Sequence, residues 1–335
     1  PLISNITSST TNGTYGVDDG VNVTVTFSES VTMTAGGVFK VPLETGSTNA
    51  DYELEIASIS GTTGSGTYTV RANDDTGGSD LLVKTSPGLS TTSSVKDAAG
   101  NILTDFSIPS SQNLDDKKNI IIDAIYPTIT NANSSTDDGT YKIGDNINLT
   151  LTFSENVTLS GGTLDITLNH GNTDNAKVSI SAFGPASTAS GTYTVAATDT
   201  TNDLDHTSIA LGTGGALVDG GGNAIQSWTP ATVLSTNKDI KIDGNRPTIM
   251  KIRSTQAAGY YKVDDVIPIQ LYFSEAVTTT AANIITATLE TGSTNADATV
   301  IYGALSNETL GTASYTVRTG DYNSSLTLNS IAISS

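Results

Sequence analysis

Apolar and polar residues alternate in short runs along the whole chain, and such runs are typical of β-strands with one buried face. The clearest run covers residues 21–27, in which every second residue is Val or Phe and the residues between them are Asn or Thr. A second run with the same alternation covers residues 147–153, and no window shows apolar residues at helical spacing. We therefore expect two inward-facing rows of side chains: Val21, Val23, Val25 and Phe27, and Ile147, Leu149, Leu151 and Phe153.

Turns rich in Gly, Asn and Asp separate these runs, which indicates an all-β fold. A parallel sheet would need crossover helices between its strands. The sequence has no segment with the pattern of such a helix. About seven short strands per unit therefore predict a two-sheet antiparallel sandwich.

The sequence contains three copies of one unit. Landmarks that recur in register are Pro1, Pro127 and Pro247; Tyr15, Tyr141 and Tyr261; Phe27-Ser28-Glu29, Phe153-Ser154-Glu155 and Phe273-Ser274-Glu275; and Tyr68-Thr69-Val70, Tyr193-Thr194-Val195 and Tyr315-Thr316-Val317. They place the first repeat at residues 1–123, the second at 124–243 and the third at 244–335. The next proline follows within a few residues of Asp123 and of Asp243, so we expect neighbouring repeats to abut.

The third repeat reaches Ser335 without the closing elements of the other two, which are an Asp-x-x-Gly-Asn turn and a last strand. Two interpretations are open: the chain is cut there, or a partner chain completes the sheet. Because Pro1 already lies within a repeat, we expect the segment to come from something longer.

The net charge of −19, from 34 acidic and 15 basic residues, opposes binding to nucleic acid and to anionic membrane surfaces. The acidity suits either a protein that takes up cations or an exposed β protein that must stay soluble. There is no cysteine, which excludes disulfides and thiolate chemistry. No apolar run approaches the ~20 residues that would span a bilayer, so we expect no direct membrane insertion.

We expect no catalytic centre. The two histidines, His170 and His206, have no counterpart in the other repeats. His170 falls in the turn where the first and third repeats have Glu44 and Glu290, which predicts a solvated turn residue. His206 has acidic neighbours but no nucleophile at a fixed spacing, and no Gly-x-Ser-x-Gly, phosphate-loop or His-x-x-x-His motif is present.

The order of motifs resembles a known class of repeat. A Tyr-x-x-x-Asp pattern precedes an alternating run that ends in Phe-Ser-Glu, then comes Tyr-Thr-Val, and in the first two repeats Asp-x-x-Gly-Asn. This order resembles the bacterial immunoglobulin-like tandem repeats of large surface proteins, of adhesin or surface-layer type. The resemblance covers nearly the whole chain, and it implies immunoglobulin-like antiparallel β-sandwiches and an extracellular location at the cell surface.

Acidic residues recur in the loops, and this pattern without His or Cys suits oxygen-preferring cations, chiefly Ca²⁺. In an immunoglobulin-like unit, the loops after strands A and E lie at the pole that faces the next repeat. We therefore expect carboxylates to converge at each junction around a Ca²⁺ that stiffens the array: Asp19, Asp74, Asp123 and Glu155 at the first junction, and Asp145, Asp199, Asp243 and Glu275 at the second. The alternative is that these turn and strand-end residues recur because the fold recurs.

The Asp-x-x-Gly-Asn turns allow two interpretations of their own. An Asp side chain that bonds back to its own turn, followed by residues that tolerate left-handed geometry, explains the spacing without a ligand. The weaker hypothesis is a second cation loop that uses Asp97 with Asn101, or Asp219 with Asn223.

These patterns favour a structural or adhesive role, with other copies of the chain or components of the cell surface and extracellular matrix as partners. The preferred hypothesis is the stalk or extender of a bacterial surface adhesin. The alternatives are a subunit of a self-assembling surface layer or extracellular filament, and an accessory module of a secreted enzyme.

Overall fold

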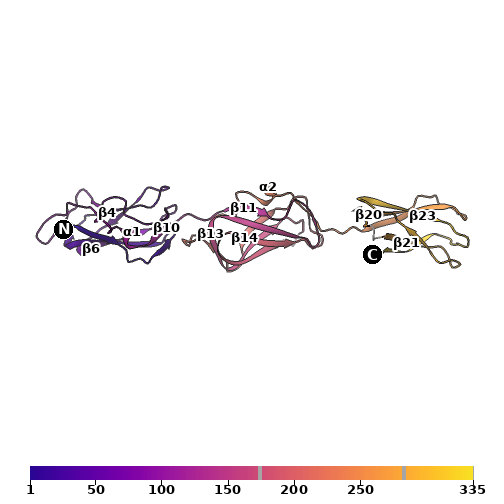
Figure 1. Ribbon diagram of the computed structural model, residues 1–335, viewed down its shortest axis with the longest axis horizontal. Helices are drawn as coiled ribbons and strands as arrows, with labels where there is room; N and C mark the ends of the chain where they lie inside the picture. Colours follow the sequence, from indigo (N-terminus) through magenta and orange to yellow (C-terminus); the bar gives the residue numbers. More distant parts are fainter. Residues whose placement is uncertain (173–175, 281–283, 335) are drawn as a thin grey trace. The chain divides into compact units, whose positions relative to one another are not determined.

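The computed structural model describes residues 1–172, 176–280 and 284–334 and is almost entirely β-structure (Figure 1). This confirms the all-β prediction, and no sheet among the described residues closes into a barrel. The described residues include two four-residue helices that the sequence did not predict, because one helical turn is too short to show a helical period. They are α1 (Leu114–Lys117) and α2 (Leu234–Asn237).

The first repeat folds into three small sheets. Its strands are β1 (Ile3–Thr7), β2 (Gly13–Tyr15), β3 (Gly20–Met33), β4 (Phe39–Leu43), β5 (Tyr52–Ile56), β6 (Ser60–Thr69), β7 (Asp75–Asp80), β8 (Gly88–Leu89), β9 (Val95–Asp97) and β10 (Ile120–Asp123). One sheet has the order β1-β3-β6, with β9 also pairing with β3, and the others are β5-β4-β8 and β2-β10-β7. In the last of these, β10 runs parallel to β2 and antiparallel to β7.

The second repeat follows the same plan with longer central strands. Its strands are β11 (Ile129–Ser134), β12 (Gly139–Lys142), β13 (Asn146–Leu168), β14 (Lys177–Thr194), β15 (Thr200–Thr201), β16 (His206–Leu211), β17 (Ala216–Val218) and β18 (Ile240–Asp243). The strands β13 and β14 pair over most of their length, as Figure 1 shows at the middle of the chain. The last strand β18 lies between β12 and β15, as β10 does between its neighbours.

The third repeat has two three-stranded sheets among its described residues, β19-β20-β23 and β22-β21-β24. The strands are β19 (Ile249–Ser254), β20 (Val266–Val277), β21 (Ile284–Glu290), β22 (Ala298–Ile301), β23 (Glu308–Thr316) and β24 (Thr327–Ser334).

Among the described residues, the buried apolar side chains form three separate clusters, and Phe27, Phe153 and Phe273 each belong to a different one. The two predicted inward rows, at residues 21–27 and 147–153, are at most 3 % exposed. By compactness, the chain divides into one unit from Pro1 to Gly244 and a second from Asn245 onward. None of the described helices could span a membrane.

Candidate functional site

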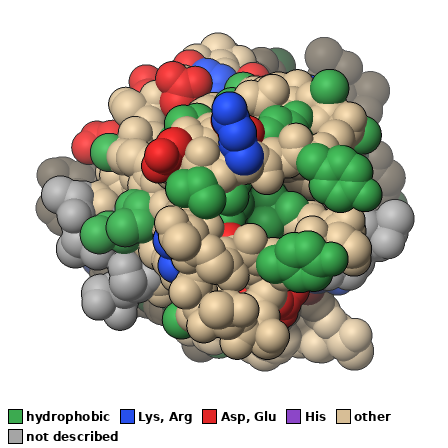
Figure 2. All heavy atoms as spheres, turned by 90° about the vertical axis from the view of Figure 1, so that its right-hand side faces the viewer, with side chains coloured by type: hydrophobic (Ala, Val, Ile, Leu, Met, Phe, Trp, Pro, Cys, Tyr) green, Lys and Arg blue, Asp and Glu red, His purple; other side chains and the backbone are tan. Residues whose placement is uncertain are grey.

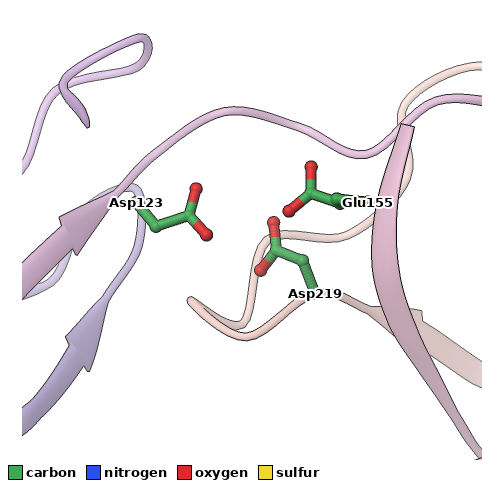
Figure 3. Close-up of side chains that lie close together, drawn as sticks. All are labelled: Asp123, Glu155 and Asp219. Carbon is green, nitrogen blue, oxygen red and sulfur yellow. The ribbon is translucent and has the colours of Figure 1, made fainter. Parts of the chain in front are cut away.

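Three acidic side chains meet where the first repeat gives way to the second. Asp123 closes β10, Glu155 lies in β13, and Asp219 begins the turn that follows β17. One carboxylate oxygen from each residue lies within 4.8 Å of the others. Figure 3 shows the three carboxylates pointing toward one another. The structure therefore joins two residues of the junction hypothesis, Asp123 and Glu155, with one from the separate turn hypothesis, Asp219.

Two members of this carboxylate trio, Asp123 and Glu155, are costly to ionise. Burial raises the pKa of Glu155 to about 7, and the negative charges of Asp123 and Asp219 add to the effect. Burial, followed by the charge of Asp219, also raises the pKa of Asp123 above its usual value. Asp75 acts on both groups with the same sign, and the sequence analysis did not include it. A cation among these oxygens would offset the cost, because a nearby positive charge favours the ionised carboxylates.

The turn that carries Asp219 also binds the first repeat directly. Inside the turn, Asp219 accepts hydrogen bonds from the backbone amides of Gly221 (2.8 Å) and Asn223 (2.9 Å). The Asn223 side chain then reaches across: its Nδ2 donates to the carbonyl of Asp123 at 2.7 Å, and its Oδ1 accepts from the amide of Val17 at 2.9 Å. Asp219 and Asn223 are 6 % and 4 % exposed, so water does not compete for these bonds.

Two glycines permit this close approach. A Cβ on Gly16 would lie 2.4 Å from the carbonyl oxygen of Gly221, and a Cβ on Gly221 would lie 2.5 Å from that of Asp123. Neither glycine has a positive φ. The requirement for glycine at these two positions therefore comes from the neighbouring repeat and not from the local backbone.

The matching turn of the first repeat, Asp97–Asn101, has the same internal hydrogen bonds but makes no such hydrogen bonds to another repeat among the described residues. Asp97 accepts from the amide of Asn101 at 2.8 Å and from its side-chain Nδ2 at 2.6 Å. These bonds lower the pKa of Asp97 below its usual value. The turn lies at the surface, and Asn101 is exposed. For this copy, the bonds account for the Asp and Asn without any ligand.

Asp74 does not join the trio, although the sequence analysis placed it there. Burial alone would raise the pKa of its carboxyl, but bonds from Arg71, Tyr68 and Asn49 outweigh burial and lower it. The contribution of Asp74 to the junction is its backbone, since its carbonyl accepts from the amide of Ala124 at 2.9 Å. A carboxylate that already accepts from these donors is a structural anchor of the linker.

Asp199, which was expected at the second junction, has in the second repeat the place that Asp74 has in the first, and its carboxylate is bonded inside its own repeat. Its carboxylate accepts from Tyr193 Oη and Asn172 Nδ2 and lies 3.0 Å from His170 Nδ1. Position 196 is Ala where the first repeat has Arg71, so the imidazole of His170 takes over the place of the guanidinium. The buried Asp keeps a side-chain partner in this place through a different residue.

The prediction that His170 is a solvated turn residue is therefore wrong: the side chain is 1 % exposed. His170 aligns with the buried Thr45 and not with Glu44, because the carbonyls of His170 and Thr45 both accept from the residue that follows the buried Asp. An offset of one residue moves a side chain to the opposite face of an extended segment.

The remaining predicted ligands lie in turns or at strand ends. Asp19 accepts from the amide of Gly16 at 3.0 Å, and Asp145 accepts from the amide of Lys142 at the same distance. Asp243 closes β18, where it pairs with Lys142 and Thr200. Glu275 lies in β20 of the other compact unit.

His206 does not form a nucleophile-activating arrangement. Asp205 stands between the two other groups: Ser235 Oγ donates to one of its oxygens at 2.5 Å, and His206 Nδ1 lies 2.9 Å from the other. Activation of a serine would need the imidazole between the hydroxyl and the carboxylate.

Comparison with known proteins adds little. No protein-family model matches the sequence, and no curated protein matches it. Among solved structures, the chain aligns with the surface layer protein SbsC, domains 4–9, at 11 % identity and a TM-score of 0.23. The alignment covers 100 % of this chain and 47 % of that one, so the chain spans about half of that structure. A TM-score this low does not establish a common fold.

Proposed function

We propose that this chain is a non-catalytic extracellular structural array, the stalk or extender of a bacterial surface adhesin, in which Ca²⁺ bound by Asp123, Glu155 and Asp219 stiffens the first junction. The observation that carries the proposal is the meeting of these three carboxylates beside a turn that bonds to both repeats. A stalk needs junctions that resist bending, and a contact of this kind supplies one.

The direct contact is the first part of the mechanism. Hydrogen bonds hold the linker from both sides: Asn223 binds the carbonyl of Asp123, and the amide of Ala124 binds the carbonyl of Asp74. Each such bond contributes on the order of 0.5–1.5 kcal/mol. Several bonds in fixed directions limit rotation about the linker more than one apolar contact would.

The cation is the second part. Ca²⁺ takes oxygen ligands at about 2.3–2.6 Å, so two oxygens on one ion are separated by at most about 5 Å. The separation within the trio, 4.8 Å or less, fits this limit. Carboxylates without nitrogen or sulfur ligands favour a hard cation over zinc or copper. Because the ion would bind residues of two repeats, it would stabilise the junction and not only one fold.

The test is thermal unfolding of the full chain with added Ca²⁺ and with chelator. We expect Ca²⁺ to raise the midpoint of the unit from Pro1 to Gly244, and Glu155→Gln to abolish that rise while increasing stability in chelator, since it removes one charge from the trio. Glu29→Gln is the matched control, because Glu29 occupies the same position in the first repeat with its side chain 48 % exposed. An unchanged midpoint for the parent chain would rule out the calcium part of the proposal.

A subunit of a self-assembling surface layer or filament is the second candidate. It is favoured by apolar side chains that lie exposed in the third repeat, among them Met250 at 69 % and Ile333 at 65 %. Such side chains mark contact surfaces. Negative-stain microscopy of the full chain separates the two candidates: isolated particles support the stalk, and sheets or fibres support the lattice.

A further inference from the structure

In the first and second repeats, the last strand pairs in parallel with a strand near the start of the same repeat. In the second repeat, β12 and β18 pair over four residues, starting with Gly139 opposite Ile240. In the first repeat, β2 and β10 pair over three residues, starting with Gly13 opposite Ile120. Because the two strands are parallel, the chain enters each pair at one end and leaves it at the opposite end.

Tension along the chain loads such a pair lengthwise. A pull on the chain before β12 and after β18 draws the two strands in opposite directions along their own axes. Every hydrogen bond across the pair is then strained at once, whereas a pull on the same end of both strands breaks the bonds one after another. Forced unfolding depends on the rate of opening and not on equilibrium stability. A parallel pair therefore resists tension more than its few hydrogen bonds suggest.

The last strand is also held on its other edge and by its side chains. On one edge of β18, the amide of Gly139 donates to the carbonyl of Asp239 at 3.0 Å, and on the other the amide of Leu204 donates to the carbonyl of Ile240 at 2.8 Å. Ile240 and Ile242 are 0 % and 2 % exposed. A slip of one residue would turn both side chains out of the core. The first repeat has the same arrangement around β10.

A tyrosine ties the turn before the pair to the first strand of the pair. Tyr141 lies in β12, and its Oη donates to the carbonyl of Asp137 at 2.7 Å. The same bond to the residue four positions earlier recurs in the other two repeats, from Tyr15 to Thr11 and from Tyr261 to Ala257. Phe would pack its ring equally well, so the hydroxyl is the feature that this bond requires.

The tyrosine bond is exposed in each repeat, and an exposed hydrogen bond adds little to equilibrium stability because water can replace it. On the face of the molecule shown in Figure 2, hydrophobic side chains lie open to solvent among polar ones, so a ring near the surface is ordinary here. The position of the bond is what matters. Asp137 lies before β12 and Tyr141 lies within it, so the bond bridges the point where tension enters the pair.

We propose that the β2–β10 and β12–β18 pairs are the tension-bearing clamps of their repeats, and that the tyrosine bond passes load from the turn into the first strand of each clamp. The bond spreads the load from Gly139, at the start of β12, to Tyr141. The proposal rests on the proposed stalk function, because a stalk is pulled along its length. It does not depend on calcium, since each clamp lies within one repeat and the calcium junction joins two.

The test is single-molecule force spectroscopy of the full chain, pulled through two introduced cysteines, which are unique handles because the sequence has no cysteine of its own. Ser135→Cys with Arg246→Cys loads β12 and β18 lengthwise, and Lys142→Cys with Arg246→Cys pulls both strands from the same end. All three positions are exposed. We expect the lengthwise pull to need at least twofold more force to unfold the second repeat. Equal forces in the two geometries would overturn the proposal.

Tyr141→Phe tests the tyrosine bond in the same two geometries. We expect the lengthwise unfolding force to fall by about a fifth or more, while the force from the same end and the melting midpoint stay as in the parent chain. Tyr15→Phe is the matched control, because it removes the same bond from a repeat outside the handles. A fall in both geometries would assign the hydroxyl to general stability and overturn its role in the clamp. Equal forces in a chain that microscopy shows as isolated particles would overturn the clamp and leave the stalk standing.

Discussion

The Asp-x-x-Gly-Asn turn occurs twice in the chain with the same internal hydrogen bonds and two different roles. The copy at Asp97–Asn101 lies at the surface and serves only its own repeat. In the copy at Asp219–Asn223, the Asp and the Asn are buried, the turn bonds to Val17 and Asp123, and it brings a carboxylate to Glu155. The motif encodes the shape of the turn, and the neighbouring repeat determines whether the turn also makes a junction.

The residues between Asp and Asn reflect this difference. The surface copy has Ala98 and Ala99, whereas the junction copy has Gly220 and Gly221. The turn therefore tolerates Ala at both positions when nothing docks on it. At the junction, the space beside Gly221 is taken by the carbonyl of Asp123, and the space beside Gly220 is open.

The largest expected effect comes from Gly221→Ala. Its Cβ would lie 2.5 Å from the carbonyl oxygen of Asp123, so the turn must move away and the bonds of Asn223 across the junction are lost. We expect a loss of about 2–4 kcal/mol in the unfolding free energy of the unit from Pro1 to Gly244, on the scale of overpacking plus lost hydrogen bonds. Chemical denaturation measures it.

Gly220→Ala is the matched control and should stay within about 0.5 kcal/mol of the parent chain. Equal effects of the two substitutions would mean that the turn itself, and not the junction, excludes a side chain.

Asp219→Asn should remove the response to Ca²⁺, because the side chain loses its charge, while its oxygen can still accept from the amides of Gly221 and Asn223. The bond from Asn223 Nδ2 to the second oxygen is lost, so the variant is judged by its response to Ca²⁺ and not by its stability in chelator. If Ca²⁺ binds at one site, an ion at 100 times its dissociation constant stabilises by about 2.7 kcal/mol, and this increment should vanish. Asp97→Asn in the surface copy should leave the increment intact. Melting with Ca²⁺ and with chelator compares the two variants, and a response retained by Asp219→Asn would place the ion elsewhere.

Asn223→Ala and Asn101→Ala compare the stability that the two turns contribute when chelator removes Ca²⁺. The first removes the acceptor of the half-buried Val17 amide and the donor to Asp123, so we expect a loss of about 2 kcal/mol. The second removes only a surface bond to Asp97 and should cost about 0.5 kcal/mol. Urea midpoints of the two variants should therefore differ, and identical midpoints would contradict the role given to Asn223.

The smallest expected effect is the pH dependence of the stability that Asp97 contributes in the surface copy of the turn. Bonds from Asn101 lower the pKa of Asp97 in the folded chain below 3.8, so its contribution to stability is present above that pH and is lost as the pH falls through the folded pKa. The small difference between the parent chain and Asp97→Asn near pH 7 should therefore disappear near pH 2. Urea titrations at both pH values measure it, and a difference that persists in acid would contradict this account.

Much of the fold could be predicted from local pattern. Alternation placed Val21 and Ile147 in cores, since a period of two assigns faces without knowledge of neighbours. The candidate site was harder to predict from the sequence. Asp123 and Glu155 were assigned to one junction from loop positions, but Asp219 was assigned to a separate turn hypothesis. The glycines at 220 and 221, where the first repeat has Ala98 and Ala99, were the available sign that something packs closely there.

By itself, the sequence determined the strands, their inward faces, the repetition and the internal bonds of the turns, because these depend on residues close together in the chain. Only the tertiary structure decided which acidic residues meet. From their loop positions, Asp74 was expected at the first junction and Asp199 at the second, yet Tyr68 and Tyr193 hold their carboxylates inside their own repeats. Asp219 lies near Glu155 because β17 pairs with β13 within the second repeat. Asp123 meets them because two repeats dock, and docking depends on contacts between residues about a hundred positions apart in the chain, such as Asn223 and Asp123.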